Sequence, residues 1–414
     1  MLDIKYIREN PELVAKKSAE KGYQVDITQL LGFDQERREL IAQVEENRRQ
    51  RNEHNAQTKG QKPSDEQLEK GRQLRDSLND LEHRLEAIEK QYNELLAAVP
   101  NVHFDDVPIG DESQSAEVSK FGEQNIGAKD HLDLLENRGL VDFERGAKVA
   151  GAKFYFIKGD LALLENALTQ YALNFITNKG FTFVSVPNLV NSKVATGTGF
   201  APRSSEQSDE YYIEGEDLSL IATAEMPLTG MHADEIIDEN YLPLMYVALS
   251  PCYRKEAGSY GKHTRGLFRV HQFNKLEMYV YSTPEKSSEV HAKLLALEEE
   301  LWQSLQIPYR VINIASGDLG APAAKKYDIE YWSKADGNYR ELTSCSNCTD
   351  YQARNLNIRV RRADGNIEML HTLNGTVVSL ARSLVAIVEH YQTEEGKIRV
   401  PDVLVPYMQN KTEI

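Results

Sequence analysis

The sequence predicts an α+β protein in which a long antiparallel helical hairpin precedes a mixed region of short strands and helices. Three observations carry this prediction: a heptad pattern in residues 74–99, a scarcity of strand signals across residues 27–99, and alternating strand and helix signals beyond residue 127. The 414 residues, 41% of them apolar, are enough for two domains with a sizeable core. We place these domains at residues 1–110 and 111–414.

The hairpin prediction depends on a heptad repeat. Its apolar positions recur at spacings of four and three residues, which is typical of a coiled-coil seam: Leu74, Leu78, Leu81, Leu85, Ile88, Tyr92, Leu95 and Val99. Gly60 and Pro63 lie between the two helical halves and can reverse the chain. Ahead of the hairpin, residues 1–26 are predicted to form a short helical segment. Pro11 suits the first position of a helix there.

The net charge of −16 argues against a general nucleic-acid coat protein, which should be basic. Charge is nevertheless uneven along the chain, because residues 100–414 carry a net −13 while residues 47–62 hold five basic side chains and one acidic one. Two interpretations stay open for the basic side chains, namely solvation of an exposed helix and contact with nucleic-acid phosphates. These side chains are Arg48, Arg49, Arg51, Lys59 and Lys62.

The sequence predicts a cytoplasmic protein that does not enter a membrane. We find neither the apolar core of a secretory signal in the first residues nor an apolar run long enough to span a bilayer. Three cysteines are too few for a disulfide framework and indicate a reducing compartment. Cys345 and Cys348 have the spacing of a zinc-ligand pair, but Cys252 alone cannot complete a four-cysteine site, so we expect no structural zinc.

After a predicted linker at residues 101–127, helical and β-rich runs alternate to the end of the chain. The Gly-rich signatures of P-loop and Rossmann nucleotide sites do not occur, so a nucleotide would have to be bound in another way. The expected elements are helices at residues 161–180, 285–305 and 377–391, and strands at residues 181–186, 244–249, 268–273 and 276–281.

Three polar segments interrupt the apolar runs of this region. The segment at residues 250–273 contains Arg254 near a strand end, where a guanidinium can hold a phosphate through two parallel hydrogen bonds, together with aromatic rings that can stack on a base. The segment at residues 336–345 contributes Glu341 and Ser344, whose oxygens suit a magnesium ion shared with phosphates. The third segment is a small-residue turn that enters an apolar helix carrying Arg382. Each arginine also has a purely structural interpretation, as a brace or a solvated cation.

The joint occurrence and order of these segments resemble the catalytic domain of class II aminoacyl-tRNA synthetases, and the whole chain with its hairpin resembles bacterial-type seryl-tRNA synthetases. The resemblance implies an antiparallel sheet flanked by helices. It also implies a homodimer in which the hairpin arm serves tRNA across subunits. The most specific segments are T-A-E at 223–225, Y-R-K-E at 253–256, G-L-F-R-V-H-Q-F at 266–273, F-N-K-L-E at 273–277, E-L-T-S-C-S-N-C at 341–348 and H-T-L-N-G-T at 371–376.

The resemblance further implies a serine–tRNA ligase with ATP, Mg²⁺, L-serine and tRNA(Ser) as substrates and partners, and tRNA(Sec) where that tRNA is present. Serine and ATP would give seryl-adenylate and pyrophosphate, and serine would then pass to the 3′ end of the tRNA. The implied catalytic residues are Arg254 and Arg382, and the implied magnesium ligands are Glu341 and Ser344. The implied ATP contacts are Arg254, Lys255, Glu256, Val270, Phe273, Glu341, Leu342, Thr343, Ser344 and Arg382. The implied serine contacts are Thr223, Ala224, Glu225, Glu277 and Thr376, and the implied tRNA contacts are the five basic side chains of residues 47–62.

Two alternatives belong to other functional classes. A ligase that charges a carrier protein is disfavoured by the complete N-terminal hairpin, which has no evident use without tRNA. An inactive paralogue acting as a coiled-coil interaction module would be expected to have lost Arg254, Glu277 or Arg382, all of which are present. The sequence departs from the family where bulkier residues replace small ones, and their effect on the pocket wall stays open: Val377, Val378 and Ala381.

Overall fold

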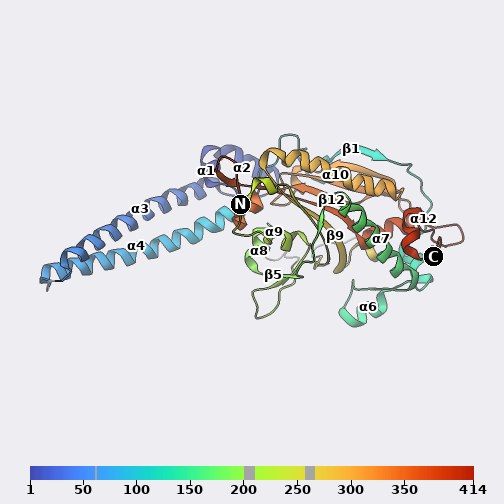
Figure 1. Cartoon of the computed structure of the whole chain (residues 1–414), viewed down its shortest axis with the longest axis horizontal. Helices are drawn as coiled ribbons and strands as arrows, with labels where there is room; N and C mark the ends of the chain where they lie inside the picture. Colours follow the sequence, from blue (N-terminus) through green and yellow to red (C-terminus); the bar gives the residue numbers. More distant parts are fainter. Residues whose placement is uncertain (61–62, 200–209, 257–265) are drawn as a thin grey trace. The chain divides into compact units, whose positions relative to one another are not determined.

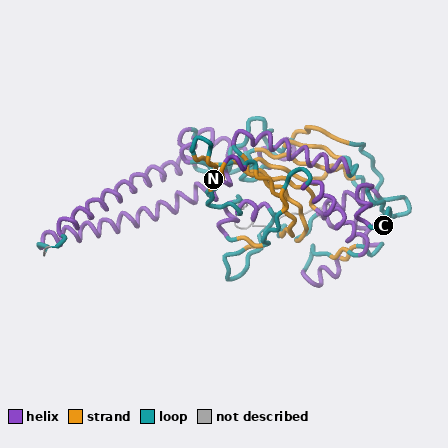
Figure 2. Tube along the Cα trace, in the orientation of Figure 1, coloured by secondary structure: helices purple, strands orange, loops and turns teal. Residues whose placement is uncertain are grey.

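The computed structural model describes residues 1–60, 63–199, 210–256 and 266–414. The chain divides into two compact units, Met1–Pro100 and Asn101–Ile414. The first unit is helical, and the second contains the strands that the structure describes (Figures 1 and 2). No helix within the described ranges is both long enough and apolar enough to cross a membrane.

The N-terminal unit contains the predicted antiparallel hairpin (Figure 1). Its second helix begins with a capping box, in which Ser64 and Gln67 each use a side chain to satisfy the other's backbone N–H. Leu74, Leu78 and Tyr92 of the heptad seam are buried, which confirms the pattern expected from the sequence. The helices are α1 (Ile4–Glu9), α2 (Pro11–Glu20), α3 (Ile27–Thr58) and α4 (Asp65–Ala98).

The main sheet of the second unit has eight strands in the order β1-β10-β11-β12-β15-β9-β8-β4. Every neighbouring pair is antiparallel except β4 and β8, so the predicted antiparallel sheet is confirmed. The strands are β1 (Ala116–Phe121), β4 (Thr182–Phe183), β8 (Leu244–Tyr253), β9 (Gln272–Ser282), β10 (Tyr309–Asn313), β11 (Lys325–Ser333), β12 (Asn338–Asn347) and β15 (His371–Ser379).

Helices cover both faces of this sheet. On one face α7 (Gly159–Thr177), α10 (Ser287–Ser304) and α12 (Leu380–Tyr391) enclose the main apolar core, to which β9 contributes every second side chain from Leu276 to Val280. The alternate β9 side chains point to the other face, where α9 (Glu225–Gly230) and α11 (Tyr351–Leu356) pack against the sheet. Lys275 and Glu277 therefore face away from the main core.

The remaining elements are short. Residues 219–220 and 236–238, for example, form strands of two small sheets beside the main one. The helices are α5 (His131–Asn137), α6 (Phe143–Ala150) and α8 (Ser192–Gly197), and the 3₁₀ turns are η1 (Glu112–Gln114), η3 (Glu239–Tyr241), η5 (Gly266–Phe268), η6 (Pro284–Lys286), η7 (Ser316–Asp318) and η8 (Asp402–Met408). The strands are β2 (Val141–Asp142), β3 (Phe156–Ile157), β5 (Leu189–Val190), β6 (Ser219–Leu220), β7 (Ile236–Asp238), β13 (Arg359–Arg361) and β14 (Ile367–Met369).

Three sequence-based expectations about local structure are wrong. The predicted linker at 101–127 contains β1, because this segment pairs with β10 and extends the sheet. The predicted strand at 268–273 begins only at Gln272, since Gly266 adopts a positive φ and starts a 3₁₀ turn. The predicted helix at 377–391 begins at Leu380, because the three residues before it still belong to β15 and pair with β9.

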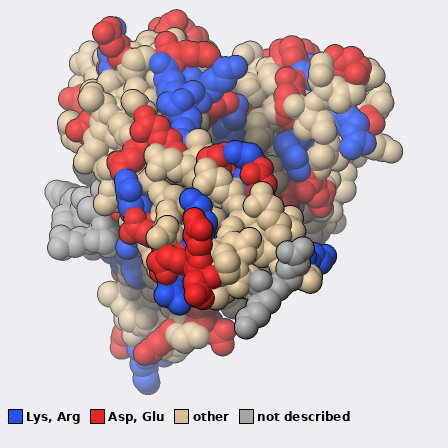
Figure 3. Space-filling view, turned by 90° about the vertical axis from the view of Figure 1, so that its left-hand side faces the viewer, with Lys and Arg blue, Asp and Glu red and all other residues tan. Residues whose placement is uncertain are grey.

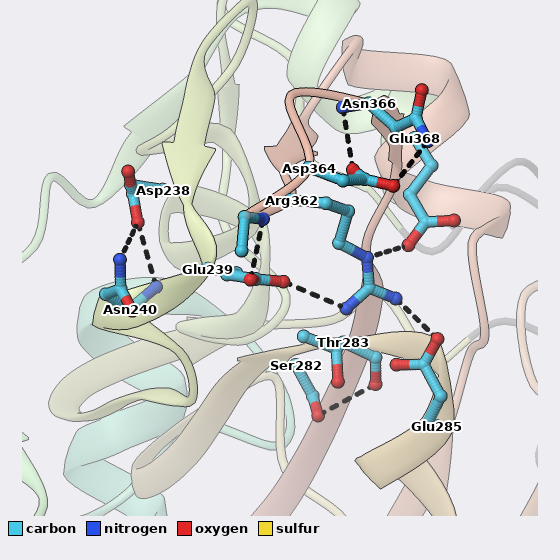
Figure 4. Close-up of polar contacts among 11 residues, drawn as sticks. Asp238, Glu239, Asn240, Ser282, Thr283, Glu285, Arg362, Asp364, Asn366 and Glu368 are labelled. Carbon is cyan, nitrogen blue, oxygen red and sulfur yellow. Dashed lines mark hydrogen bonds and ion pairs between the residues drawn. The ribbon is translucent and has the colours of Figure 1, made fainter.

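A three-stranded sheet, β14-β13-β7, is tied to the main body by Arg362 (Figure 4). The guanidinium lies 3.4 Å from the Glu239 carboxylate and also donates hydrogen bonds to Glu285 and Glu368. Glu239 accepts a further bond of 2.7 Å from the backbone N–H of Ala363. The hydrogen bond from Arg362 is the main reason that the pKa of Glu285 falls to about 2. One cation thus joins carboxylates from η3, η6 and β14.

Replacing Arg362 by methionine is expected to lower the free energy of unfolding at pH 7 by about 1 kcal/mol, because three carboxylates lose their shared cation. The pKa of Glu285 is lower in the folded state than its ordinary value of 4.5. The contribution is therefore present above about pH 4.5 and is lost as the pH falls toward 2. Thermal unfolding at pH 7 and pH 3 measures it, with Arg361→Met as a control at an exposed neighbour. An equal deficit at both pH values would contradict this role.

Candidate active site

A solvent-open pocket lies where β8, β9, β12 and β15 meet the start of α12. It brings together every implied ATP contact except Lys255, whose ammonium lies over the rings of Tyr211 and Tyr212, 5.8 and 5.6 Å from their centroids. The lining residues are Arg254, Glu256, Leu267, Phe268, Val270, Phe273, Lys275, Glu341, Leu342, Thr343, Ser344, Thr376, Ser379, Ala381 and Arg382.

A β-bulge in β12 brings the two implied magnesium ligands to the same face. Glu341 and Ser344 are three residues apart, so a regular strand would point them to opposite faces. The pairing with β11 skips Leu342, because Thr343 lies opposite Ile329 and Glu341 opposite the next residue along. The extra residue turns Glu341 to the same side as Ser344, and both line the pocket.

A second bulge lies in β15. It determines which of the bulkier residues Val377, Val378 and Ala381 reach the pocket wall. The pairing of β15 with β9 skips Val377, so Thr376 and Ser379 both line the pocket although they are three residues apart. Val377 and Val378 are buried in the main apolar core, whereas Ala381 lines the pocket. The two valines therefore do not form the pocket wall.

Positive charge dominates the environment of Glu341. Its carboxylate lies 3.0 Å from Nη1 of Arg382. Burial alone would raise the pKa of Glu341, but Arg382, Lys326 and Arg254 together lower it to about 2. Glu341 is consequently ionised at neutral pH, as a carboxylate must be to bind a cation.

Both pocket arginines stack on aromatic rings. The Arg254 guanidinium carbon lies 5.4 Å from the ring centroid of Phe273, and that of Arg382 lies 5.0 Å from the ring centroid of Phe268. Nε of Arg254 also donates to the backbone oxygen of Ala222 at 3.4 Å, directly before the T-A-E segment. These contacts hold two planar cations at fixed places in the pocket.

Of the implied serine contacts, Thr376 lines this pocket and Glu277 contacts two of its lining residues. Thr376 donates its hydroxyl to Oε2 of Glu277 at 3.2 Å, and Nζ of Lys275 lies 2.6 Å from the same oxygen. Lys275 and Glu277 are buried, and both extend from the face of β9 that is turned away from the main core. Sequence reasoning missed Lys275, although strand alternation alone places it on the face of Glu277.

Glu225 is buried at the start of α9, directly after Thr223 and Ala224. Its Oε1 accepts hydrogen bonds from Nε2 of Gln352 at 2.7 Å and from Nδ2 of Asn374 at 2.8 Å. Burial and the nearby Glu277 raise the pKa of Glu225 to about 7, against the opposing effect of these hydrogen bonds and of Lys275. The site thus holds two buried carboxylates beside a cation-rich pocket. No pattern in the sequence pointed to Gln352.

The comparisons with known proteins agree along the chain. A family model for the seryl-tRNA synthetase N-terminal domain matches residues 1–103, and one for the tRNA synthetase class II core domain (G, H, P, S and T) matches residues 209–391. The serine–tRNA ligase of Rubrobacter xylanophilus is 41% identical over 99% of this chain and 98% of its own length. That of Dictyoglomus turgidum is 44% identical, with the same two coverages. The chain belongs to the seryl-tRNA synthetase family.

Solved structures of family members extend the agreement to the fold. A seryl-tRNA synthetase from Pyrococcus horikoshii, complexed with ATP, matches with a TM-score of 0.90 and 42% identity, over 100% of this chain and 99% of the other. A cytoplasmic serine–tRNA ligase from Naegleria fowleri, in complex with AMP, matches with a TM-score of 0.85 and 33% identity, over 100% and 98%. Membership makes this chain an ATP-dependent aminoacyl-tRNA ligase, as the motifs predicted.

The basic hairpin side chains of this family member are partly engaged with acidic neighbours. Arg48 lies 2.6 Å from Glu82 on the facing helix, and Arg49 lies 2.7 Å from Glu46 and 2.6 Å from Glu53. Figure 3 likewise shows basic and acidic side chains interspersed on one face of the molecule. Such exposed pairs are weak and can be exchanged for other anions. Of the other three implied tRNA contacts, Arg51 is half-buried, Lys59 is exposed, and Lys62 lies outside the described residues.

Proposed function

We propose that this chain attaches L-serine to tRNA(Ser), and to tRNA(Sec) where that tRNA is present, in two steps. The serine carboxylate attacks the α-phosphorus of ATP and displaces pyrophosphate, which gives seryl-adenylate. The terminal adenosine hydroxyl of the tRNA then takes the seryl group and AMP departs. The observation that carries the proposal is the Lys275–Glu277–Thr376 contact, which joins a cation-rich pocket to a pair of buried carboxylates.

In the first step the pocket arginines act by neutralising charge. Arg254 would bind the α-phosphate, where negative charge develops in the transition state, and Arg382 the γ-phosphate of a bent ATP. Phe273 would stack on the adenine, with Glu256 and the backbone near Val270 at its edge. No protein nucleophile is required, because positioning and charge neutralisation suffice for phosphoryl chemistry of this kind.

The buried carboxylates would select serine. Glu277 and Glu225 suit a substrate that presents an ammonium group and a hydroxyl, and Thr376 and the T-A-E turn would complete the site. A site that hydrogen-bonds a substrate hydroxyl leaves polar groups unpaired when alanine binds, which costs about 10⁴- to 10⁵-fold in rate. Threonine would be excluded by shape.

Glu341 and Ser344 fit the magnesium ion that the resemblance implies. They are hard oxygen donors on one face of β12, and Glu341 is ionised at neutral pH. Mg²⁺ favours one or two carboxylates together with substrate phosphates. Bound there with ATP, the ion would supply charge neutralisation at the phosphate oxygens.

We further propose a cytoplasmic homodimer in which the hairpin of one subunit serves the tRNA charged by the other. A dimer interface over α7 and β4 is supported by Leu163 of α7 and Phe183 of β4, because their side chains are large, apolar and exposed. The three cysteines are free, which suits a reducing compartment. A carrier-protein ligase is the less favoured activity, because the hairpin would then have no role.

An ATP–pyrophosphate exchange assay across all twenty amino acids, with and without tRNA, tests the proposed activity. Serine should support exchange without tRNA, and alanine should be slower in kcat/KM by at least about 10⁴-fold. Transfer of labelled serine to tRNA(Ser), measured beside transfer to a carrier protein, separates the two ligase classes. A profile that peaks at another amino acid would overturn the proposal.

A further inference from the structure

We propose that Gln352 is a positioning residue of the serine site, whose side-chain amide orients the Glu225 carboxylate and joins it to the end of α8. Gln352 lies on α11, 127 residues from Glu225 in sequence, and is fully buried. This inference rests on the proposed function, because the proposed function is what gives Glu225 a role in serine binding.

The amide of Gln352 has its full set of hydrogen bonds. Nε2 donates to Oε1 of Glu225 at 2.7 Å and to the backbone oxygen of Thr198 at 3.0 Å. Oε1 accepts from the hydroxyls of Tyr279 at 3.0 Å and Thr372 at 2.7 Å. The Thr198 carbonyl can only accept, so the nitrogen must face it, and the same nitrogen then faces Glu225. The amide therefore has one orientation, with an N–H directed at the carboxylate.

This orientation determines how Glu225 presents its charge. Gln352 and Asn374 both donate to Oε1, so neither occupies Oε2. The charged groups that act on Glu225 are Glu277 and Lys275, both from β9, which oppose each other in their effect on its pKa. The two amide donors favour the ionised carboxylate, which is the form that a serine ammonium group requires.

Gln352 shares a second task with Asn355, one turn further along α11. Nδ2 of Asn355 donates to the backbone oxygen of Gly197 at 2.8 Å, next to the Thr198 oxygen that Gln352 binds. The last carbonyls of a helix have no partner within the helix, so these two amides together hold the end of α8. Among the contacts that the structure describes, Asn355 binds α8 and does not bind Glu225, which makes it a matched control for the structural part of the role.

The test uses pyrophosphate exchange with the full chain. Gln352→Met is expected to raise the KM for serine about tenfold, with the KM for ATP within about twofold of wild type, because the carboxylate loses one of two donors. The acid limb of kcat/KM for serine should move about one unit to higher pH, because an unsupported carboxylate ionises less readily. Asn355→Leu should lower the thermal unfolding midpoint as Gln352→Met does, but leave the serine KM and the acid limb unchanged.

A second variant keeps the test decisive if Gln352→Met fails to fold. Gln352→Glu retains the acceptor for Tyr279 and Thr372 but removes the amide donors, and it should raise the serine KM at least as much. Normal serine KM and pH profile in a folded Gln352 variant, or the same changes in Asn355→Leu, would overturn the inference. Absence of serine-dependent exchange in the wild-type protein would instead overturn the proposed function.

Discussion

Arg254→Ala is expected to slow serine-dependent pyrophosphate exchange by at least about 10³-fold, because charge that develops at the α-phosphate would lose its fixed counter-charge. Arg254 is well placed for this role. It stacks on Phe273 and donates to the oxygen of Ala222, so its cation needs little reorganisation during the reaction. The loss should appear in kcat more than in the KM for ATP, since the interaction strengthens in the transition state.

Two further variants sharpen this experiment. Arg254→Lys keeps the charge but loses the planar fork of donors, so its rate should lie between those of wild type and Arg254→Ala. Arg399→Ala removes an arginine that also stacks on an aromatic ring, 5.8 Å from the centroid of Tyr391, but does not line the pocket, and it should exchange normally. Near-normal exchange by folded Arg254→Ala would refute the assignment.

The sequence predicted the hairpin because its signals are local, whereas the antiparallel sheet was implied by the family resemblance of the motifs. Heptad spacing and the capping box at Ser64 are short-range features, and they determine the second helix of the hairpin without any distant contact. The implied ATP contacts lie in short segments, and the pocket gathers all but one of them. Their catalytic roles stay predictions, since proximity in a pocket does not establish what each side chain binds.

What the sequence could not predict depends on partners far along the chain. β1 looked like linker because its pairing partner β10 lies nearly 200 residues away. The bulge at Leu342 is visible only in the register with β11, yet it decides whether Glu341 and Ser344 share a face. Gln352 likewise acquires its role from Glu225 and Thr198, and no periodicity relates these positions.

The basic hairpin side chains should govern tRNA affinity without affecting adenylate formation. The triple change Arg48→Gln, Arg49→Gln and Arg51→Gln is expected to raise the KM for tRNA(Ser) by about 10- to 100-fold, because up to three phosphate contacts are lost. For the same reason, the slope of the logarithm of the binding constant against the logarithm of the salt concentration should become about 2 to 3 less steep. Pyrophosphate exchange without tRNA should be unchanged, since the hairpin belongs to one compact unit of the chain and all the pocket residues belong to the other. Equal loss of exchange and charging would contradict this role.

The ion pairs of the hairpin provide the opposite test. Arg48 is held by Glu82, and Arg49 by Glu46 and Glu53, so tRNA phosphates must compete with these carboxylates. Glu82→Gln and Glu46→Gln should therefore lower the KM for tRNA(Ser), most clearly at low salt, where exposed charges are least screened. If the arginines only solvate the helix surface, neither glutamate variant will change tRNA affinity beyond the small effect of one net charge. Opposite shifts in the arginine and glutamate variants, with exchange constant in both, are the result that phosphate contact requires.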